Sequence, residues 1–326
     1  MGMKRAAHMA LGGIASVLLS VNGWAGEARA QAIEGKRGPS VIIAEAPDDQ
    51  WRTVDPAQLV VMELEHGRIT IELSDFFAPN HVAQMKTLVK AGYYDGLSFY
   101  RVIEGFVAQG GDPFSIRPLP DAATNSLMSE FEIRLGNGLL GADPFRFYAP
   151  IDKDGYADGT GWHQGFAMGI ANGDGHNDMG RFWLLHCTGA FAFGRNNDPD
   201  SASTEFYITL QPQRYLDRNL TVFGRVIDGM EHVQALTRQA PPEEEGDPLG
   251  DMIVRAWMGD TPPEDETSPN WQVFRTGNEI FADYVESRRN RPEAFFIYRP
   301  NHVDVCQLPI PVRQTPAPRD GDEDTP

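Results

Sequence analysis

The fold of this chain is decided by one stretch, Phe99-Tyr-Arg-Val-Ile-Glu-Gly-Phe-Val-Ala-Gln-Gly-Gly-Asp112. It is an apolar, strand-like run that carries a single cation, Arg101. It ends in a double glycine, where the backbone can turn at positions that a β-carbon would block. Because side chains alternate between the two faces of a strand, Val107 and Gln109 lie on one face. The stretch therefore predicts a strand that presents a cation, an amide and an apolar side chain.

A second strand of this kind is predicted at 205–210, where Glu205 and Tyr207 share one face. The two strands can bring their polar and apolar side chains to one groove. The sequence has no Ser-His-Asp order, no activated cysteine and no phosphate-cradling loop. The chemistry of such a groove would depend on hydrogen bonds and apolar contacts rather than on a nucleophile.

Outward from these strands, the sequence predicts a mainly β fold. Residues 59–73 alternate apolar and polar side chains on both sides of His66-Gly67, as two half-buried strands joined by a tight turn do. An amphipathic helix is predicted after Pro79 and a shorter helix over 229–236. Further strands are predicted at 97–108, 182–185, 190–193 and 221–226. Many short strands, two helices and glycine-rich turns fit a closed β-barrel with helices at its ends.

Composition limits the class of protein. The chain has 326 residues, of which 41% are hydrophobic and 23% charged, so it has the composition of a globular protein. It carries 46 acidic and 28 basic residues, a formal net charge of -18. This balance argues against a nucleic-acid-binding surface, which needs Lys and Arg to neutralise phosphates. Two cysteines are too few for a disulfide-built small fold or a four-cysteine zinc site.

Four segments outside the barrel are predicted to be less regular. Residues 31–57 are polar without a sustained period and are expected to form a flexible lead-in. A long loop insert is expected at about 136–180, in a stretch rich in Gly, Asp and Pro. Residues 241–313 are predicted to form a linker and a C-terminal extension with one helix, from about Gly277 to Arg288. Residues 314–326 are predicted to be a disordered tail.

The N-terminus has the pattern of a secretory signal peptide. Lys4 and Arg5 precede a short apolar run at 9–21, and Ala28-Arg29-Ala30 has small residues where a signal peptidase cleaves. We expect residues 1–30 to be removed, and an uncleaved membrane anchor is the alternative. The mature protein is then expected in the periplasm, without a membrane span.

Export would place Cys187 and Cys306 in an oxidising compartment. They either form a disulfide that ties the C-terminal segment to the middle of the chain or remain two buried thiols. Both alternatives stay open, because the sequence does not give the distance between the two Cα atoms.

Two Asp- and Gly-rich turns, at 152–159 and 172–178, are similar to calcium-binding loops. Their glycines do not fall at the spacing of an EF-hand, and no glutamate closes the first of them. We therefore expect solvated turns, with a bound cation as the alternative, and we predict no metal site.

Three separated blocks, in this order, resemble the cyclophilin-type peptidyl-prolyl cis-trans isomerases. They are the stretch 99–112, Ser203-Thr-Glu-Phe-Tyr-Ile-Thr209 and Tyr215-Leu-Asp-Arg-Asn-Leu-Thr-Val-Phe-Gly-Arg-Val-Ile-Asp-Gly-Met230. The resemblance runs from about Leu59 to Leu236 and implies a cyclophilin-like domain at 58–240, with an insert that the ordinary family lacks. It implies a closed eight-stranded antiparallel β-barrel capped by two helices, which agrees with the pattern of strands and helices above.

The resemblance also implies a reaction, the rotation of X-Pro peptide bonds in proline-containing client chains, and it implies no cofactor. Arg101 would donate a hydrogen bond to the prolyl nitrogen, and Gln109 would orient Arg101. The catalytic residues implied are Arg101, Phe106 and Gln109, and the substrate-binding residues implied are Val107, Glu205, Tyr207, Leu216 and Leu220.

The sequence departs from the family at two places in this predicted site. Glu205 stands where the family usually has Gln, and its carboxylate could pair with Arg101 and compete with donation to the prolyl nitrogen. The turn Arg195-Asn-Asn-Asp-Pro-Asp200 replaces a small turn beside the groove that takes the residues before the proline. The alternative function is therefore a catalytically weak or inactive binding module, or a chaperone for envelope proteins.

Overall fold

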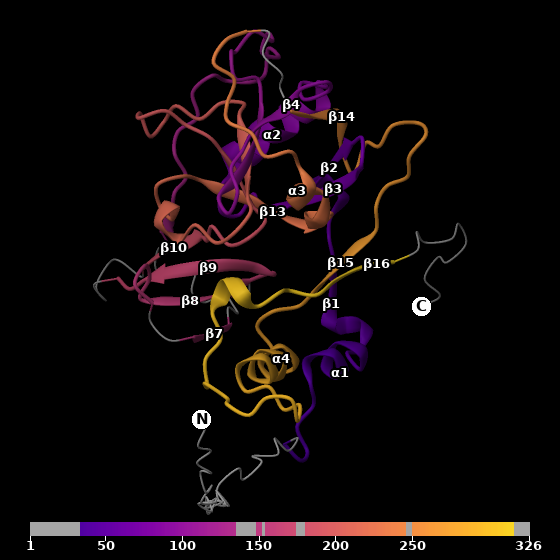
Figure 1. Ribbon diagram of the computed structural model, residues 1–326, viewed down its shortest axis with the longest axis vertical. Helices are drawn as coiled ribbons and strands as arrows, with labels where there is room; N and C mark the ends of the chain where they lie inside the picture. The colour runs from indigo at the N-terminus through magenta and orange to yellow at the C-terminus, as the bar shows by residue number, and fades with distance from the viewer. Residues whose placement is uncertain (1–32, 135–147, 152–153, 174–179, 246–249, 316–326) are drawn as a thin grey trace, which may run out of the picture.

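Eight antiparallel strands close into a barrel in the computed structural model, which describes residues 33–134, 148–151, 154–173, 180–245 and 250–315. Around the barrel the order is β11-β12-β5-β4-β14-β2-β3-β13, and the barrel forms the upper half of Figure 1. The barrel strands are β2 (Leu59–Leu64), β3 (Gly67–Leu73), β4 (Ser98–Val102), β5 (Val107–Gly111), β11 (Ala190–Phe193), β12 (Phe206–Thr209), β13 (Val222–Asp228) and β14 (Asp251–Met258). The predicted barrel is confirmed.

The barrel is filled by the inward side chains of these strands. Met62 on β2 lies opposite Ile69 on β3, and both are fully buried. The Phe206 ring lies 5.4 Å from the Phe99 ring and 5.3 Å from the Phe191 ring, measured between centroids. Burial of each side chain of this size contributes roughly 1.5–3 kcal/mol. The alternation in the sequence therefore produces the closed core directly.

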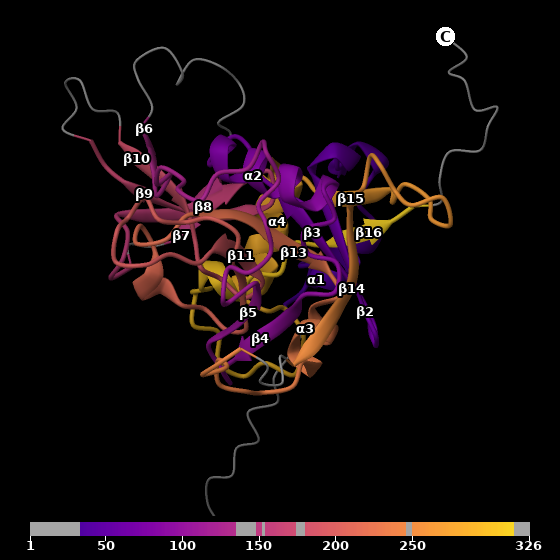
Figure 2. The same ribbon diagram turned by 90° about the horizontal axis from the view of Figure 1, so that it is seen from above.

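The two predicted helices, α2 (Pro79–Lys90) and α3 (Met230–Ala235), are confirmed and pack on the barrel. α2 begins with a proline, at a position where the missing N–H has no helical partner in any case. Its apolar face buries Val82, Met85 and Leu88 in the barrel core. α3 packs against β3, as Figure 1 shows, and Figure 2 gives the view down onto the barrel.

The barrel continues past residue 240, where the sequence analysis ended it. β14 closes the barrel by pairing with β2 and, at its first two residues, with β4. The prediction of a solvated linker over this segment is wrong, because Ile253, Ala256 and Met258 point into the core. A register shift between Ile253 and Arg255 breaks the strict alternation, so the strand does not show the expected period of two.

The insert is a five-stranded antiparallel sheet and not the long loop predicted at 136–180. Both of its faces are buried, because Phe166 and Phe182 pack toward the barrel while Trp162 and Trp183 pack with α4 (Glu279–Arg289). The strand predicted at 182–185 is confirmed as one of the five, but a sheet covered on both faces lacks alternating polar residues, and for this reason the other four were not predicted. The strands, in spatial order, are β6 (Ile133–Arg134), β10 (Arg181–Leu184), β9 (Phe166–Ala171), β8 (Gly159–His163) and β7 (Tyr148–Ile151).

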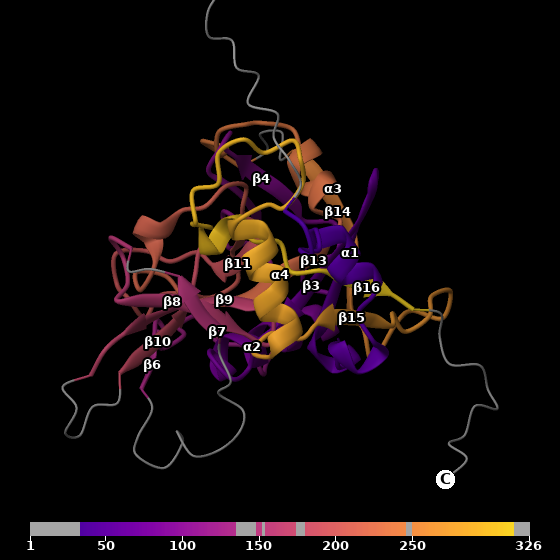
Figure 3. The ribbon, with the colours of Figure 1, turned by 90° about the horizontal axis from the view of Figure 1, so that it is seen from below.

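Strands from the two ends of the described chain both pair with one central strand below the barrel. β1 (Trp51–Thr53), β15 (Trp271–Phe274) and β16 (Val312–Gln314) form a three-stranded sheet, and α1 (Pro39–Ala44) packs against α4. Figure 3 shows α4 lying across this face with α1 beside it. Four short 3-10 helices complete the described elements: η1 (Asp48–Gln50), η2 (Pro56–Gln58), η4 (Arg214–Leu216) and η5 (Val305–Gln307).

The prediction of a flexible lead-in over 31–57 is therefore wrong for 39–53. Trp51 is buried and lies opposite Phe274 on β15, a partner more than 200 residues away that no local period could reveal. The predicted C-terminal helix is confirmed as α4, which buries Phe281 and Tyr284. Gln314, assigned to the tail, is part of β16, whereas 316–326 and the predicted signal peptide 1–30 lie outside the described residues. No helix within the described ranges has the length and apolar character needed to cross a bilayer.

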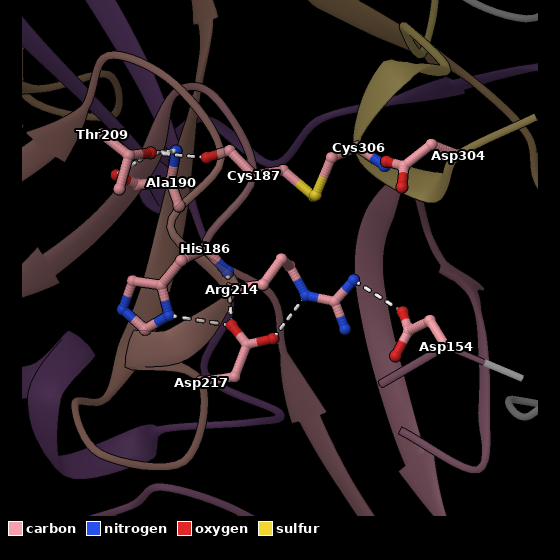
Figure 4. The surroundings of a disulfide bond; sticks show 9 residues. All are labelled: Asp154, His186, Cys187, Ala190, Thr209, Arg214, Asp217, Asp304 and Cys306. Atoms are coloured by element: carbon pink, nitrogen blue, oxygen red, sulfur yellow. Dashed lines mark hydrogen bonds and ion pairs between the residues drawn. A yellow bond between two sulfur atoms is a disulfide. The ribbon is translucent and has the colours of Figure 1, made fainter. Parts of the chain in front are cut away.

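Cys187 and Cys306 form a disulfide, with their Cα atoms 4.9 Å apart (Figure 4). Cys187 lies between β10 and β11, and Cys306 lies in η5 of the C-terminal extension. Of the two alternatives that the sequence left open, the structure shows the bridge. It ties the C-terminal extension to the barrel.

Candidate active site

A row of facing residues crosses four barrel strands at the candidate site. Gln109 on β5 lies opposite Arg101 on β4, and on its other side opposite Tyr207 on β12. Tyr207 in turn lies opposite Ala192 on β11, which is fully buried in the same apolar cluster as Tyr207. The neighbours of these residues along the strands, such as Ala108, point into the barrel core. The predicted parity is confirmed, and the site lies on the outer face of the barrel.

A bulge in β4 brings one further side chain to this row. Ser98 pairs with Gly111 and Arg101 pairs with Gln109, so β4 has one residue more than β5 between these pairs. As a result, Tyr100 reaches the same site as its neighbour Arg101. Its hydroxyl accepts a hydrogen bond from Gln109 Nε2 at 2.5 Å. The sequence analysis missed Tyr100, because strict alternation places it on the opposite face.

These residues line a pocket of about 460 Å³ on the barrel surface. All eight predicted catalytic and substrate-binding residues contribute to it. Arg195, which belongs to the departing turn, and Ser203 also line it, although neither was predicted as a site residue. The lining residues are Arg101, Phe106, Val107, Gln109, Pro113, Ser115, Gly194, Arg195, Asn196, Ser201, Ser203, Thr204, Glu205, Tyr207, Leu216 and Leu220.

One end of the pocket is apolar. Val107 and Tyr207 are buried in the cluster that joins the barrel to the insert sheet, and Phe106 and Leu220 pack against this cluster with part of their surface exposed. Leu216 approaches from η4. Such a concave surface of aromatic and aliphatic groups can accept a small apolar ring.

Arg101 stands beside this apolar surface. Its guanidinium carbon lies 5.4 Å from the centre of the Phe106 ring, and its Nη1 donates to Gln109 Oε1 at 3.2 Å. Within the described residues no carboxylate lies within 4 Å of Arg101, and its Nε and Nη2 have no hydrogen-bond partner. Gln109 therefore fixes one edge of the guanidinium, and the other donors stay available to a ligand.

Glu205 does not form the direct pair with Arg101 that its charge suggested. Its Oε2 accepts hydrogen bonds from the Tyr100 hydroxyl at 2.6 Å and from Gln109 Nε2 at 3.0 Å. Burial raises the pKa of Glu205 above its usual value, and these two hydrogen bonds oppose that change. Glu205 thus holds the amide of Gln109 so that its oxygen faces Arg101.

Gly111 is required where β5 meets the segment that carries Glu205. Its φ is +131°, a conformation that L side chains rarely adopt, and a Cβ there would lie 3.1 Å from the Glu205 Cα. The double glycine noted in the sequence therefore allows β12 to approach β5 closely.

Behind the pocket, a polar chain supports Tyr207. The Tyr207 hydroxyl lies 2.8 Å from His186 Nε2, and His186 Nδ1 lies 3.0 Å from Asp217 Oδ1. Because a carboxylate only accepts, Nδ1 of His186 carries a hydrogen and donates it to Asp217. Asp217 also binds Arg214, which reaches Asp154 in the insert (Figure 4). Asp154 of the insert and His186, which precedes Cys187, thus help to hold Tyr207 in its place beside the pocket.

The described residues contain no group of three or more His, Cys, Asp or Glu that could hold a metal ion. Of the two Asp- and Gly-rich turns, residues 152–153 and 174–179 lie outside the described part of the chain. In the first turn, Asp154 Oδ1 accepts hydrogen bonds from the backbone amides of Tyr156 and Ala157. Its other oxygen, Oδ2, accepts from Arg214 Nη1, so this carboxylate has protein partners on both oxygens.

Comparison with known proteins assigns the family. The chain is 28% identical over 204 residues to a probable peptidyl-prolyl cis-trans isomerase of Brucella suis, an alignment of 62% of this chain and 83% of that protein. It is 33% identical over 172 residues to a peptidyl-prolyl cis-trans isomerase of Schizosaccharomyces pombe, covering 52% of this chain and 79% of that one.

Among solved structures, the cyclophilin AquaCyp293 from Hirschia baltica is similar to this chain with a TM-score of 0.64 and 30% identity. The similarity covers 86% of this chain and 98% of that one, so it extends beyond the barrel. The family model for cyclophilin type peptidyl-prolyl cis-trans isomerase/CLD matches residues 59–257, which end within β14. This chain therefore belongs to the cyclophilin-type peptidyl-prolyl cis-trans isomerase family.

Proposed function

We propose that this chain accelerates cis-trans rotation about X-Pro peptide bonds and that Arg101 donates a hydrogen bond to the prolyl nitrogen during the rotation. The single observation that carries the proposal is the position of Arg101, whose unpaired donors border the apolar pocket lined by Phe106, Val107 and Leu216. The family assignment supports the same reaction.

The reaction needs little chemistry from the protein. Amide resonance sets a barrier of about 18–20 kcal/mol, and an unaided X-Pro bond isomerises in tens to hundreds of seconds. As the bond twists, resonance is lost and the prolyl nitrogen becomes a hydrogen-bond acceptor. A donor aimed at this nitrogen therefore binds the twisted state more strongly than the planar one, and only such differential binding raises the rate.

The residues around Arg101 have two further roles, to hold the substrate and to orient the guanidinium. The apolar pocket holds the proline ring, so that the other end of the peptide rotates. Gln109 orients the guanidinium, and Tyr100 and Glu205 hold Gln109. No bond is broken, so none of these side chains has to act as a nucleophile.

The test is an isomerisation assay on an Ala-Pro peptide with the wild type, Arg101→Ala and, as a matched control, Arg275→Ala. Arg275 is exposed and does not line the pocket, and among the described residues its side chain donates only to the Asp49 carbonyl, while its backbone bonds Gln50. We expect acceleration by the wild type and by Arg275→Ala, and a loss of about 10²–10³-fold in kcat for Arg101→Ala, as for other removed transition-state donors. A wild type that does not accelerate the peptide would refute the proposal.

The alternative, a binding module without turnover, assumed that Glu205 neutralises Arg101. The hydrogen bonds of Glu205 to Tyr100 and Gln109 do not favour it. Measurable peptide binding by a wild type without turnover, together with activity in Glu205→Gln, would support the alternative.

We also propose that the clients are exported proteins in the periplasm. The disulfide supports this, because disulfides persist in oxidising compartments. After expression in a bacterium with two membranes, mass spectrometry of the periplasmic extract should find a chain that begins at Gln31. A full-length chain confined to the cytoplasm would contradict export.

A further inference from the structure

The pocket is lined by a second arginine. It lies at the β11 end of the row of four strands, whereas Arg101 lies at the β4 end. Arg195 follows β11 and lines the pocket together with Leu220. Its Nε donates to the carbonyl oxygen of Asn219, the residue that precedes Leu220, at 2.8 Å. Its guanidinium carbon lies 5.7 Å from the centre of the Phe131 ring. The position of this cation at the rim is therefore fixed by the protein before any ligand binds.

The charge of Arg195 is not neutralised by a partner. Its hydrogen bonds reach only carbonyl oxygens, those of Asn219, Asn196 and Asn197, and no carboxylate of the described residues lies within 4 Å of it. Its Nη2 has no hydrogen-bond partner among the same residues. In a chain with a net charge of -18, most other arginines that the structure describes have a carboxylate partner, for example Arg214.

The acidic residue that lines the pocket and the two in the turn after Arg195 have other hydrogen-bond partners. Glu205 accepts from Tyr100 and Gln109. In the turn that follows Arg195, Asp198 accepts from the backbone amide of Asp200, and Asp200 accepts from the backbone amide of Ser129. An open guanidinium edge thus borders the apolar pocket, and its natural ligand is a carboxylate, which accepts from such a fork with good geometry.

We propose that Arg195 is a specificity residue that selects client segments with an aspartate or glutamate next to, or one residue removed from, the isomerising proline. The proposal rests on the proposed function, because it places the proline ring in the apolar pocket. A client carboxylate would then accept a hydrogen bond from Arg195 Nη2, while a client lysine would be repelled.

The experiment measures kcat/KM for peptides that differ at one position. The series places Glu, Gln, Ala or Lys at each of the two positions on either side of the proline, and the enzymes are the wild type, Arg195→Gln and Arg195→Lys. Arg275→Gln is the control, because it removes the same charge from the chain without contacting the pocket. Its inclusion separates the effect of Arg195 from that of the overall negative charge.

At one or more positions, we expect the wild type to prefer Glu over Gln by about two- to fivefold, the size of a partly exposed charge pair. In Arg195→Gln the ratio of kcat/KM for the Glu peptide to that for the Gln peptide should fall to about one, Arg195→Lys should keep part of the preference, and Arg275→Gln should keep all of it. The difference between the wild type and Arg195→Gln should shrink in 0.5 M salt, which screens partly exposed charges.

Two results would overturn this inference while leaving the proposed function intact. One is equal kcat/KM of the wild type for Glu and Gln peptides at all four positions. The other is a preference for Glu that persists in Arg195→Gln. If the Ala peptide is not isomerised at all, the failure lies with the proposed function.

Discussion

Removal of the disulfide should destabilise the protein by an amount that follows from the length of chain between the two cysteines. Cys187 and Cys306 are 119 residues apart, so the bridge removes about 16 cal/mol/K of entropy from the unfolded chain, or about 5 kcal/mol at 25 °C. Native contacts of the extension, such as Phe281 and Trp51 in a common apolar cluster, remain in the absence of the bridge. The double variant Cys187→Ser, Cys306→Ser should therefore fold, with a lower free energy of unfolding.

The assay is urea unfolding followed by circular dichroism, on the double variant and on the wild type with and without a reductant. We expect a loss of about 2–5 kcal/mol for the double variant, allowing for structure that remains in the unfolded chain, and a similar loss for the reduced wild type. Each should unfold at a lower urea concentration. A loss below about 1 kcal/mol in both would refute the view that the bridge acts by restricting the unfolded chain.

Two pH dependences follow from buried groups. Burial, reinforced by the charge of Arg52, lowers the pKa of His163 in the folded protein to about 4. The unfolded chain therefore binds the proton more tightly than the folded one. As the pH drops from 6.5 to 4, the free energy of unfolding should fall by up to about 3 kcal/mol. An NMR titration should find the His163 ring neutral at pH 5.5, and a midpoint near 6.5 would contradict this. Burial raises the pKa of Glu205 in the folded protein above its usual value of 4.5. The contribution of Glu205 to stability therefore falls as the pH rises from this usual pKa through the raised one. Glu205→Gln should therefore need more urea than the wild type to unfold at pH 7 and should lose this advantage toward pH 4; equal urea midpoints at pH 7 would contradict the account.

The barrel and most of the pocket could be predicted from the sequence. Their strands carry the signal locally, because apolar residues that fill the core alternate with polar ones, as Ile69 does with Arg68 and Thr70. The match of three motifs in order then related these strands to the pocket residues. Both lines of reasoning placed Arg101, Gln109 and Tyr207 together, as the strand register does.

What the sequence missed depends on geometry that is not local. The bulge that brings Tyr100 to Gln109 adds one residue to a strand whose composition does not change. β14 escaped prediction because its register shifts, and β1 because its partner lies at the other end of the chain. The disulfide needed a Cα distance, which only the packing of the extension provides.

The central claim, that Arg101 acts on the twisted peptide bond rather than on the bound ground state, is tested most directly by NMR exchange spectroscopy on a proline peptide. The experiment gives the exchange rate on the enzyme and the peptide dissociation constant from one sample. For Arg101→Ala, the account predicts an exchange rate lower by about 10²–10³-fold and a dissociation constant within about threefold of the wild type. A dissociation constant that rises by the whole loss of activity, with the exchange rate unchanged, would contradict it.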